Sequence, residues 1–260
     1  MLPKTLILHS NGTNRDHEAA QAFELAGAQV EIVHLNQLRR GERRWQDYHI
    51  MVLPGGFSYA DALGAGRLLA LDLKTYFAEQ VSAFVASGRP VIGICNGFQA
   101  LVKAGVLPEP GNGNQHATLT FNDSGHFECR WVWLQPQSQA CIWTSGLQTP
   151  IYCPVAHGEG KFTLPEPSLS HKLCAGGQIP LVYARSDGTP AQGIYPENPN
   201  GSLLDIAGVC NPQGNVLGLM PHPEDHIFPH QHPRWLRGED GGSGLPLFKN
   251  GVSFAAQFGA

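Results

Sequence analysis

The stretch Pro90-Val-Ile-Gly-Ile-Cys-Asn-Gly-Phe-Gln-Ala-Leu-Val-Lys-Ala-Gly105 decides the fold. Its first five residues form an apolar run that predicts a buried strand, and residues 98–105 have the spacing of a helix. Between them, Gly93-Ile-Cys-Asn-Gly97 has the pattern of a nucleophile on a sharp strand-to-helix turn. Glycines suit both sides of such a turn, because a neighbouring Cβ would clash with the strained nucleophile. Cys95 is therefore a candidate nucleophile at a helix N-terminus, where backbone N–H groups stabilise a thiolate and an oxyanion.

Strands and helices alternate on the N-terminal side of this turn. We expect strands at residues 5–9, 29–34 and 49–53, and a helix at 17–27. Residues 61–88 predict one long or two short helices, with Asp61 as a plausible N-cap. Such alternation is typical of an α/β fold with an open, mostly parallel twisted sheet that has helices on both faces.

The pattern changes after residue 105. Residues 127–134 and 150–157 alternate apolar and polar side chains, as antiparallel hairpins do, so the second half is expected to add antiparallel strands to the first. Residues 229–244 are rich in His, Pro and Gly and predict no secondary structure. We interpret residues 1–260 as one domain with a loop-rich C-terminal extension from about 229.

Composition limits the classes of function. Charged residues make up 15% of the chain and apolar residues 42%, with a net charge of −4, so a disordered chain and a nucleic-acid partner are not expected. No apolar run is long enough for a membrane span or a signal peptide, and a cytoplasmic location is expected. Six cysteines without a C-x-x-C pair predict free thiols, and those other than Cys95 are expected to be structural.

A catalytic thiolate needs a base and a group that orients the base. His222 is the strongest of twelve histidines for this role, because Pro221-His-Pro-Glu224 directly follows an apolar strand pattern at 214–220. In an extended segment the side chains of His222 and Glu224 point the same way, so Glu224 could orient the His222 ring. A solvated loop pair without a role is the alternative for this short motif.

Two glycine-rich turns are candidate anion sites. Pro54-Gly-Gly-Phe-Ser58 follows a predicted strand, and its N–H groups could complete an oxyanion hole with the N–H of Asn96; an ordinary tight turn is the alternative. His157-Gly-Glu-Gly-Lys161 is a near miss for a phosphate loop, because position 155 is Val where that motif needs Gly. No ATP site is expected in this chain.

A rival constellation of possible metal ligands lies near the C-terminus. It comprises His222, Glu224, Asp225, His226, His230, His232 and Asp240. The spacing is irregular and three prolines interrupt any helix, so we predict no metal site here and expect the last three histidines to be loop residues.

Several of these segments together resemble one family. They are Pro54-Gly-Gly-Phe-Ser-Tyr59, Gly93-Ile-Cys-Asn-Gly-Phe-Gln99, Ala156-His-Gly-Glu-Gly160 and Met220-Pro-His-Pro-Glu224, with Gly12-Thr-Asn-Arg-Asp16 and Phe23-Glu-Leu-Ala-Gly-Ala28 near the N-terminus. The set is similar to the glutaminase subunits of phosphoribosylformylglycinamidine synthase, which are class I (triad) glutamine amidotransferases of purine biosynthesis. The resemblance covers roughly residues 5–226 and implies the flavodoxin-like fold of that class.

The resemblance also implies roles for individual residues. Cys95 would be the nucleophile, His222 the general base and Glu224 its orienting group. Gly55, Gly56, Phe57 and Asn96 fall where the family binds substrate and its oxyanion, and Gln99 resembles the glutamine that helps to hold the substrate. Asp225 departs from the family pattern, in which Arg commonly follows H-P-E.

The family's activity is hydrolysis of glutamine to glutamate and ammonia through a cysteine thioester. The resemblance implies that ammonia passes to a synthetase subunit, which uses ATP and Mg²⁺ to convert formylglycinamide ribonucleotide to the amidine, and that a small accessory subunit completes the complex. No cofactor is expected in this chain. Another cysteine-nucleophile hydrolase of the same architecture and a non-enzymatic metal-binding module are the alternatives.

Overall fold

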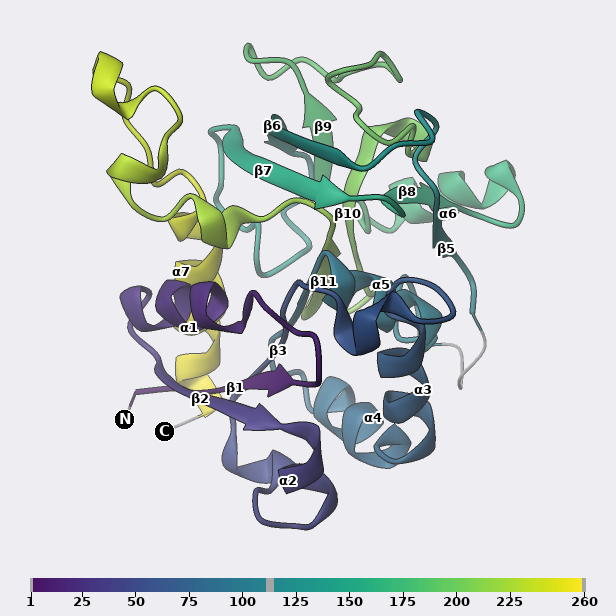
Figure 1. The fold of residues 1–260 in the computed structure, drawn as a ribbon, viewed down its shortest axis with the longest axis vertical. Helices are drawn as coiled ribbons and strands as arrows, with labels where there is room; N and C mark the ends of the chain where they lie inside the picture. The colour runs from purple at the N-terminus through teal and green to yellow at the C-terminus, as the bar shows by residue number, and fades with distance from the viewer. Residues whose placement is uncertain (1, 111–114, 259–260) are drawn as a thin grey trace.

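A single nine-stranded sheet organises the computed structural model, which describes residues 2–110 and 115–258 (Figure 1). Its strand order is β2-β1-β3-β4-β11-β10-β9-β6-β7. The five strands from β2 to β11 run parallel, and the four from β10 to β7 are antiparallel to their neighbours. The predicted parallel sheet with added antiparallel strands is therefore confirmed, and the second half extends the same sheet.

The strands of this sheet are β1 (Lys4–His9), β2 (Gln29–His34), β3 (Ile50–Leu53), β4 (Val91–Ile94), β6 (Glu128–Pro136), β7 (Ile151–His157), β9 (Leu181–Ala184), β10 (Ile206–Cys210) and β11 (Val216–Leu219). A separate antiparallel pair joins β5 (Thr118–Thr120) to β8 (Lys161–Thr163). Every residue of β3, β4 and β11 is buried, because helices cover both faces of the parallel part.

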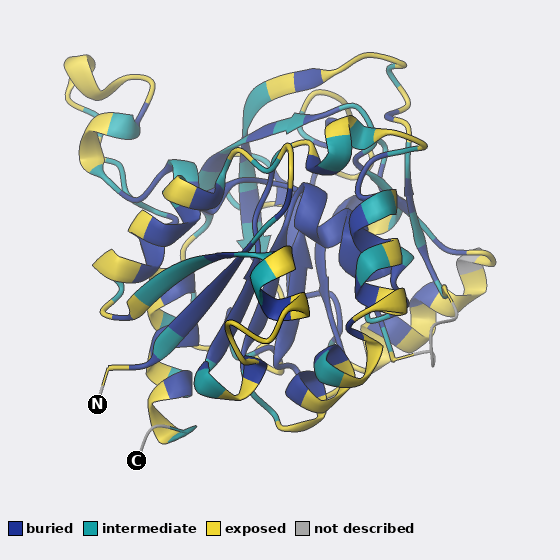
Figure 2. Cartoon of the chain, turned by 60° about the horizontal axis from the view of Figure 1, so that its bottom comes forward, coloured by how far each residue is buried: buried dark blue, intermediate teal, exposed yellow. Residues whose placement is uncertain are grey.

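Helices lie on both sides of the parallel strands (Figure 1). The α-helices of the described residues are α1 (Asp16–Leu25), α2 (Leu35–Arg39), α3 (Arg67–Thr75), α4 (Ala78–Ala86), α5 (Asn96–Lys103), α6 (Ser170–Ala175) and α7 (Leu245–Ala255). Helices α1 and α7 pack together on one side, and α3, α4 and α5 lie on the other. Figure 2 shows the strands as a buried centre with the exposed residues on the outer surfaces of the helices.

The C-terminal segment differs from the expectation of a loop-rich extension. Residues 229–241 form short 3₁₀ turns in an arm that projects from the body, but Leu245–Ala255 is the regular helix α7. Pro246 stands in its first turn, where the missing N–H costs nothing, and Leu247 and Phe248 are buried against the sheet. Helix α7 thus supplies part of the covering that the parallel strands require.

The predicted N-cap at Asp61 is wrong. Residues Ser58–Asp61 form a 3₁₀ turn, and α3 begins at Arg67 after Gly66, whose φ of 68° is left-handed. The Asp61 carboxylate accepts a hydrogen bond from the Gly66 N–H at 3.3 Å and another from Asn96, so it orders the loop before the helix.

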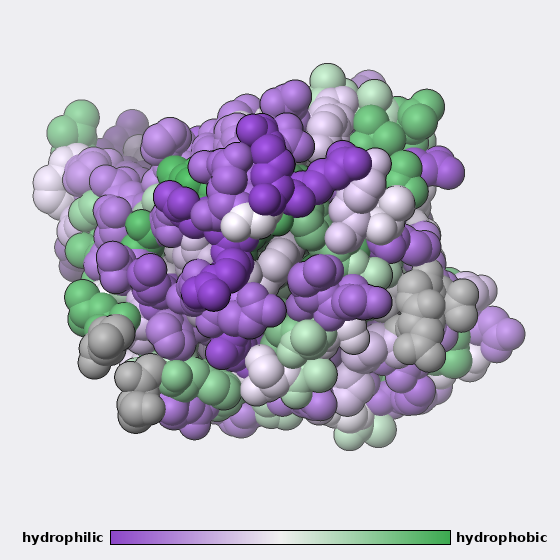
Figure 3. Space-filling view, turned by 90° about the horizontal axis from the view of Figure 1, so that it is seen from below, coloured by the Kyte–Doolittle hydropathy of each residue, from purple (hydrophilic) through white to green (hydrophobic). Residues whose placement is uncertain are grey.

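The surface is mainly polar on the face seen in Figure 3, where hydrophobic side chains form small scattered groups. Within residues 2–110 and 115–258, no helix is long and apolar enough to cross a bilayer. All six cysteines lie in these ranges and all are free.

Candidate active site

Three neighbouring parallel strands end at the same edge of the sheet. Register pairs Leu53 of β3 with Gly93 of β4, and Ile94 of β4 with Leu219 of β11. Cys95 follows β4 directly, and its N–H donates to the Leu219 carbonyl at 2.8 Å. The turn after β3 and the segment after β11 therefore lie on either side of Cys95. Carboxyl ends of parallel strands are where open α/β sheets place their functional groups.

Cys95 occupies the strained turn that its neighbours predict. Its φ of 49° and ψ of −104° lie outside the usual regions for a residue with a side chain. A Cβ on Gly97 would approach the Leu53 carbonyl oxygen to 1.9 Å, and one on Gly93 would approach the Gly97 oxygen to 2.8 Å. Both flanking positions therefore need glycine, and the turn holds the Cys95 thiol at the start of α5.

His222 and Glu224 lie behind the Cys95 thiol and touch each other. The Nδ1 atom of His222 is 2.7 Å from Oε1 of Glu224, and the His222 N–H donates to the Pro154 carbonyl of β7 at 2.8 Å. The segment is not extended, as the sequence argument assumed, because Pro223–Asp225 forms a 3₁₀ turn. The contact arises from that turn, which brings the Glu224 carboxylate back beneath the ring.

Electrostatics favour a protonated His222. The side chain is 3% exposed and Glu224 is 0% exposed. Burial lowers the pKa of His222, but the charges of Glu224 and Cys95, together with hydrogen bonds to both, raise it well above its usual value. The His222 ring is therefore suited to accept a proton from the Cys95 thiol.

The other histidine at this site, His157, is a weaker candidate base. Its Nδ1 lies 3.0 Å from the Asn122 amide oxygen, so no carboxylate orients it. Burial and the nearby charge of His222 lower the pKa of His157 to about 4. It is neutral at neutral pH and serves as a wall of the pocket.

A cavity of about 160 Å³ opens beside the thiol. Its lining comprises Gly56, Phe57, Asp61, Ala65, Cys95, Gln99, Phe121, Phe127, Ala156, His157, Gly158 and Glu159. The Cys95 thiol donates a hydrogen bond to the Ala156 carbonyl at 3.6 Å. The pocket thus combines a cysteine thiol with apolar rings and polar groups, as small-molecule sites do.

The turn after β3 leaves room for the His222 ring. A Cβ on Gly55 would lie 2.7 Å from Cε1 of His222, so glycine leaves the space that the ring occupies. Gly56 has a φ of 131° and bridges to Thr13 of the β1–α1 loop. The Phe57 N–H donates to the Gly12 carbonyl at 3.0 Å, so it is not free to bind an oxyanion as the sequence predicted. The Phe57 side chain lines the pocket.

Gln99 lines the pocket, and Asn96 lies one turn before it on α5 and is hydrogen-bonded to it. The Asn96 N–H opens helix α5, where first-turn donors have no acceptor within the helix. Its amide oxygen accepts from Ser58, and its Nδ2 donates to Asp61 at 2.8 Å and to Gln99 at 3.2 Å. Gln99 in turn donates to the Glu159 carbonyl at 2.7 Å.

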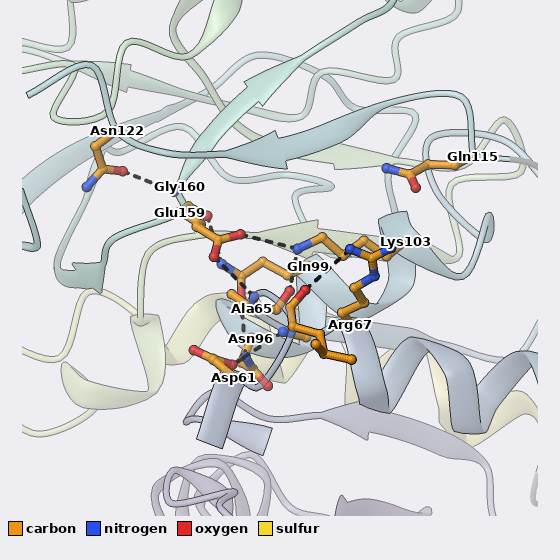
Figure 4. A network of polar contacts seen from close by, with 12 residues as sticks. Asp61, Ala65, Arg67, Asn96, Gln99, Lys103, Gln115, Asn122, Glu159 and Gly160 are labelled. Atoms are coloured by element: carbon orange, nitrogen blue, oxygen red, sulfur yellow. Dashed lines mark hydrogen bonds and ion pairs between the residues drawn. The ribbon is translucent and has the colours of Figure 1, made fainter. Parts of the chain in front are cut away.

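Sequence reasoning missed the rest of this network, which Figure 4 shows in close-up. Glu159 accepts from the Ala65 N–H at 3.2 Å and pairs with Lys103 at 3.4 Å, and Lys103 also donates to the Ala65 carbonyl. Helical spacing could have linked residues 96, 99 and 103, because they lie three, four and seven positions apart and so share a face of α5. No local pattern could place Glu159 against them.

The predicted loop histidines do not join the catalytic group. His226 Nδ1 is 2.5 Å from the Tyr152 carbonyl, and its ring lies 5.5 Å from that of His232 beside Trp131. Within the described ranges, no group of three or more His, Cys, Asp or Glu side chains is arranged to hold a metal ion. Lys161, from the near-miss phosphate loop, pairs with Asp123.

Comparison with known proteins gives a consistent result. A family model described as a CobB/CobQ-like glutamine amidotransferase domain matches residues 2–255. The chain is 53% identical to the phosphoribosylformylglycinamidine synthase subunit PurQ of Treponema denticola, over 98% of this chain and 99% of that protein. It is 46% identical to the corresponding subunit of Dehalococcoides mccartyi, over 98% of each. Among solved structures, PurLQS from Thermotoga maritima aligns with a TM-score of 0.75 at 29% identity, covering 98% of this chain and 99% of that one.

The motif resemblance and these matches agree along nearly the whole chain. The chain therefore belongs to the CobB/CobQ-like glutamine amidotransferases and, within them, to the family of the phosphoribosylformylglycinamidine synthase subunit PurQ.

Proposed function

We propose that this chain is the glutaminase subunit of a phosphoribosylformylglycinamidine synthase and that Cys95, His222 and Glu224 are its catalytic triad. Family membership supports the activity. The observation that carries the assignment of residues is the contact chain from Glu224 through His222 to Cys95, at the edge of a pocket. Gly55, Gly56, Phe57, Asn96 and Gln99 would surround the bound glutamine.

The geometry supports a two-step reaction. His222 takes the proton of Cys95, and the sulfur attacks the side-chain amide carbon of glutamine, so that a C–S bond forms and the carbonyl oxygen becomes an oxyanion. Backbone N–H groups at the start of α5 and in the Gly55-Gly56 turn stabilise this charge. His222 then returns the proton to the amide nitrogen as the C–N bond breaks, and ammonia leaves a glutamyl thioester.

The second step regenerates the thiol. Water gives a proton to His222 while its oxygen attacks the thioester carbon; as the C–S bond breaks and glutamate is released, His222 returns the proton to the Cys95 sulfur. Glu224 orients the ring through Nδ1 and stabilises the imidazolium form of His222 in each transition state.

The ammonia needs an acceptor outside this chain. We propose that it passes to a synthetase subunit that binds ATP and Mg²⁺, with a small accessory subunit in the same complex, and that the complex is cytoplasmic. The alignment of this chain with the PurLQS structure from Thermotoga maritima supports such an assembly. No cofactor is assigned to the chain itself.

Covalent labelling tests the proposal. The purified chain, alone and with its partner subunits, is exposed to 6-diazo-5-oxo-L-norleucine, a glutamine-like electrophile, and analysed by intact mass and peptide mapping. We expect one adduct on Cys95 that excess glutamine prevents and that Cys95→Ala abolishes. Labelling spread over several cysteines, or none with the partners present, would contradict the triad.

The rival hydrolase remains testable in the same preparation. Cleavage of esters or peptides with no turnover of glutamine would favour it. Elemental analysis of the purified chain tests the second alternative, because a metal-binding module would contain bound metal.

A further inference from the structure

An arginine from helix α1 lies behind the triad. Arg15 is the N-cap residue of α1 and ends the β1–α1 loop. That loop packs against the turn after β3, because Thr13 bridges to Gly56 and the Gly12 carbonyl accepts from the Phe57 N–H. Arg15 therefore reaches the site from a part of the chain that contributes no member of the triad.

The side chain of Arg15 spans from the base to its acidic neighbours. A Cβ on Gly55 would lie 3.5 Å from Cγ of Arg15 and 2.7 Å from Cε1 of His222, so the arginine stem and the imidazole ring face each other across Gly55. The guanidinium Nη1 lies 3.0 Å from Oε1 of Glu18 and 3.6 Å from Oδ1 of Asp225.

Negative charge is concentrated at this end of the triad. Glu224 is fully buried, and its Oε2 has no hydrogen-bond partner among the described residues. Asp225 is adjacent and its side chain is 19% exposed. Burial and the charge of Glu224 raise the pKa of Asp225 to about 6. Burial lowers the pKa of Arg15, but the charges of Asp225, Glu18 and Glu224 raise it above its usual value.

We propose that Arg15 is a positioning residue for the triad: its guanidinium pairs with Asp225 and offsets the negative charge beside Glu224, so that the Glu224 carboxylate keeps its contact with His222. The proposal rests on the function proposed above and deepens it. Arg15 does not touch the reacting atoms. Its effect on the reaction passes through Asp225, Glu224 and the His222 ring, which lies close to the Arg15 stem at Gly55.

The sign of the expected effect follows from electrostatics. A cation near an acid or an imidazole favours the form with fewer protons, and an anion favours the form with more. Cys95, Cys153 and His157 also act on His222 or Glu224, and they keep their surroundings in a variant of Arg15. Glu18 acts on Asp225 and loses its ion-pair partner when Arg15 is replaced. Loss of Arg15 therefore moves the acid limb of the activity profile to higher pH, and loss of the Asp225 charge moves it to lower pH.

The experiment measures kcat and KM for glutamine hydrolysis against pH, using the full chain with its partner subunits. The variants are Arg15→Gln, Arg15→Lys, Asp225→Asn and the double variant Arg15→Gln/Asp225→Asn. Arg44→Gln is the matched control, because Arg44 also pairs with an acid three residues away, at 2.8 Å, in an exposed turn outside the site.

We expect the acid limb of Arg15→Gln to move up by about half a pH unit, the size expected for a partly exposed charge pair, and kcat to fall with little change in KM. Arg15→Lys should restore the wild-type limb, Asp225→Asn should move it the other way, and the double variant should lie between the two. Arg44→Gln should match the wild type.

Three results would overturn the proposal: an unmoved limb in Arg15→Gln, a shift of the same sign in Asp225→Asn, or a loss of kcat that Arg15→Lys does not rescue. A purely structural role predicts the last pattern together with lower thermal stability. If Arg15→Gln does not fold, the pH profiles of Arg15→Lys and Asp225→Asn test the proposal in its place. Absence of glutaminase activity and of Cys95 labelling in the wild-type complex refutes instead the proposed function.

Discussion

Gly55→Ala is the substitution for which the structure makes the sharpest prediction. The added Cβ would lie 2.7 Å from Cε1 of His222, whereas ordinary contacts begin at 3.4 Å, so ring and turn must separate by about 0.7 Å to reach ordinary contact. The ring cannot adjust freely, because its Nδ1 is held by Glu224 at 2.7 Å and its backbone N–H by Pro154 at 2.8 Å. A misplacement of about 1 Å in a catalytic group costs on the order of 10²-fold in rate.

We therefore expect kcat/KM for glutamine hydrolysis to fall by about 100-fold, which corresponds to about 2.7 kcal/mol of transition-state stabilisation. Folding should survive, because Gly55 is not among the glycines with positive φ and alanine can adopt its backbone conformation. The assay pairs steady-state glutaminase kinetics with thermal unfolding and with alkylation of Cys95 by iodoacetamide. Activity close to wild type in a folded Gly55→Ala chain would refute the position assigned to His222.

Three further predictions concern the triad and its neighbour. Cys95→Ala should abolish glutamine-dependent synthesis by the complex and leave ammonia-dependent synthesis intact; loss of both in parallel assays would reject a separate nucleophile. Glu224→Gln should lower kcat by about 10- to 100-fold, the loss of one charged hydrogen bond, and less than His222→Ala; equal residual rates would show that Glu224 is not subordinate. Asp225 has a pKa of about 6 when folded, above its usual 3.8, so the stability linked to this group is present below about pH 4 and decreases as the pH rises through 6. Asp225→Asn should therefore raise the free energy of unfolding by on the order of 2 kcal/mol at about pH 8, with little change near pH 4, and a denaturant titration at both pH values that shows equal effects would contradict this.

Local patterns were sufficient for the parallel half of the fold. Short-range signals predicted β3, β4 and β11 from their apolar runs and α5 from its helical spacing. The glycines around Cys95 indicated a steric requirement, and the structure shows that a Cβ at either position would clash. His222 could be selected because it follows a strand of the predicted sheet, and strand ends converge at one edge.

Other features depend on long-range contacts. Helix α7 was missed because its identity rests on burying Leu247 and Phe248 against the sheet, and the Pro- and Gly-rich segment before it gives no helix signal. Phe57 was expected to present its N–H to an oxyanion, but the Gly12 carbonyl, 45 positions away in the chain, accepts that hydrogen bond.

The sequence by itself determined the sheet type, the strained cysteine turn, the resemblance to a glutaminase family and the identity of the three candidate catalytic residues. These features depend on spacing within a few residues and on short motifs, both of which are visible in the sequence alone. Only the tertiary structure decided that Glu224 reaches His222 through a 3₁₀ turn, that Glu159 of the pocket wall pairs with Lys103, and that Arg15 stands behind the triad. Such contacts join side chains that are distant in sequence, and their geometry exists only after the sheet has aligned the strand ends.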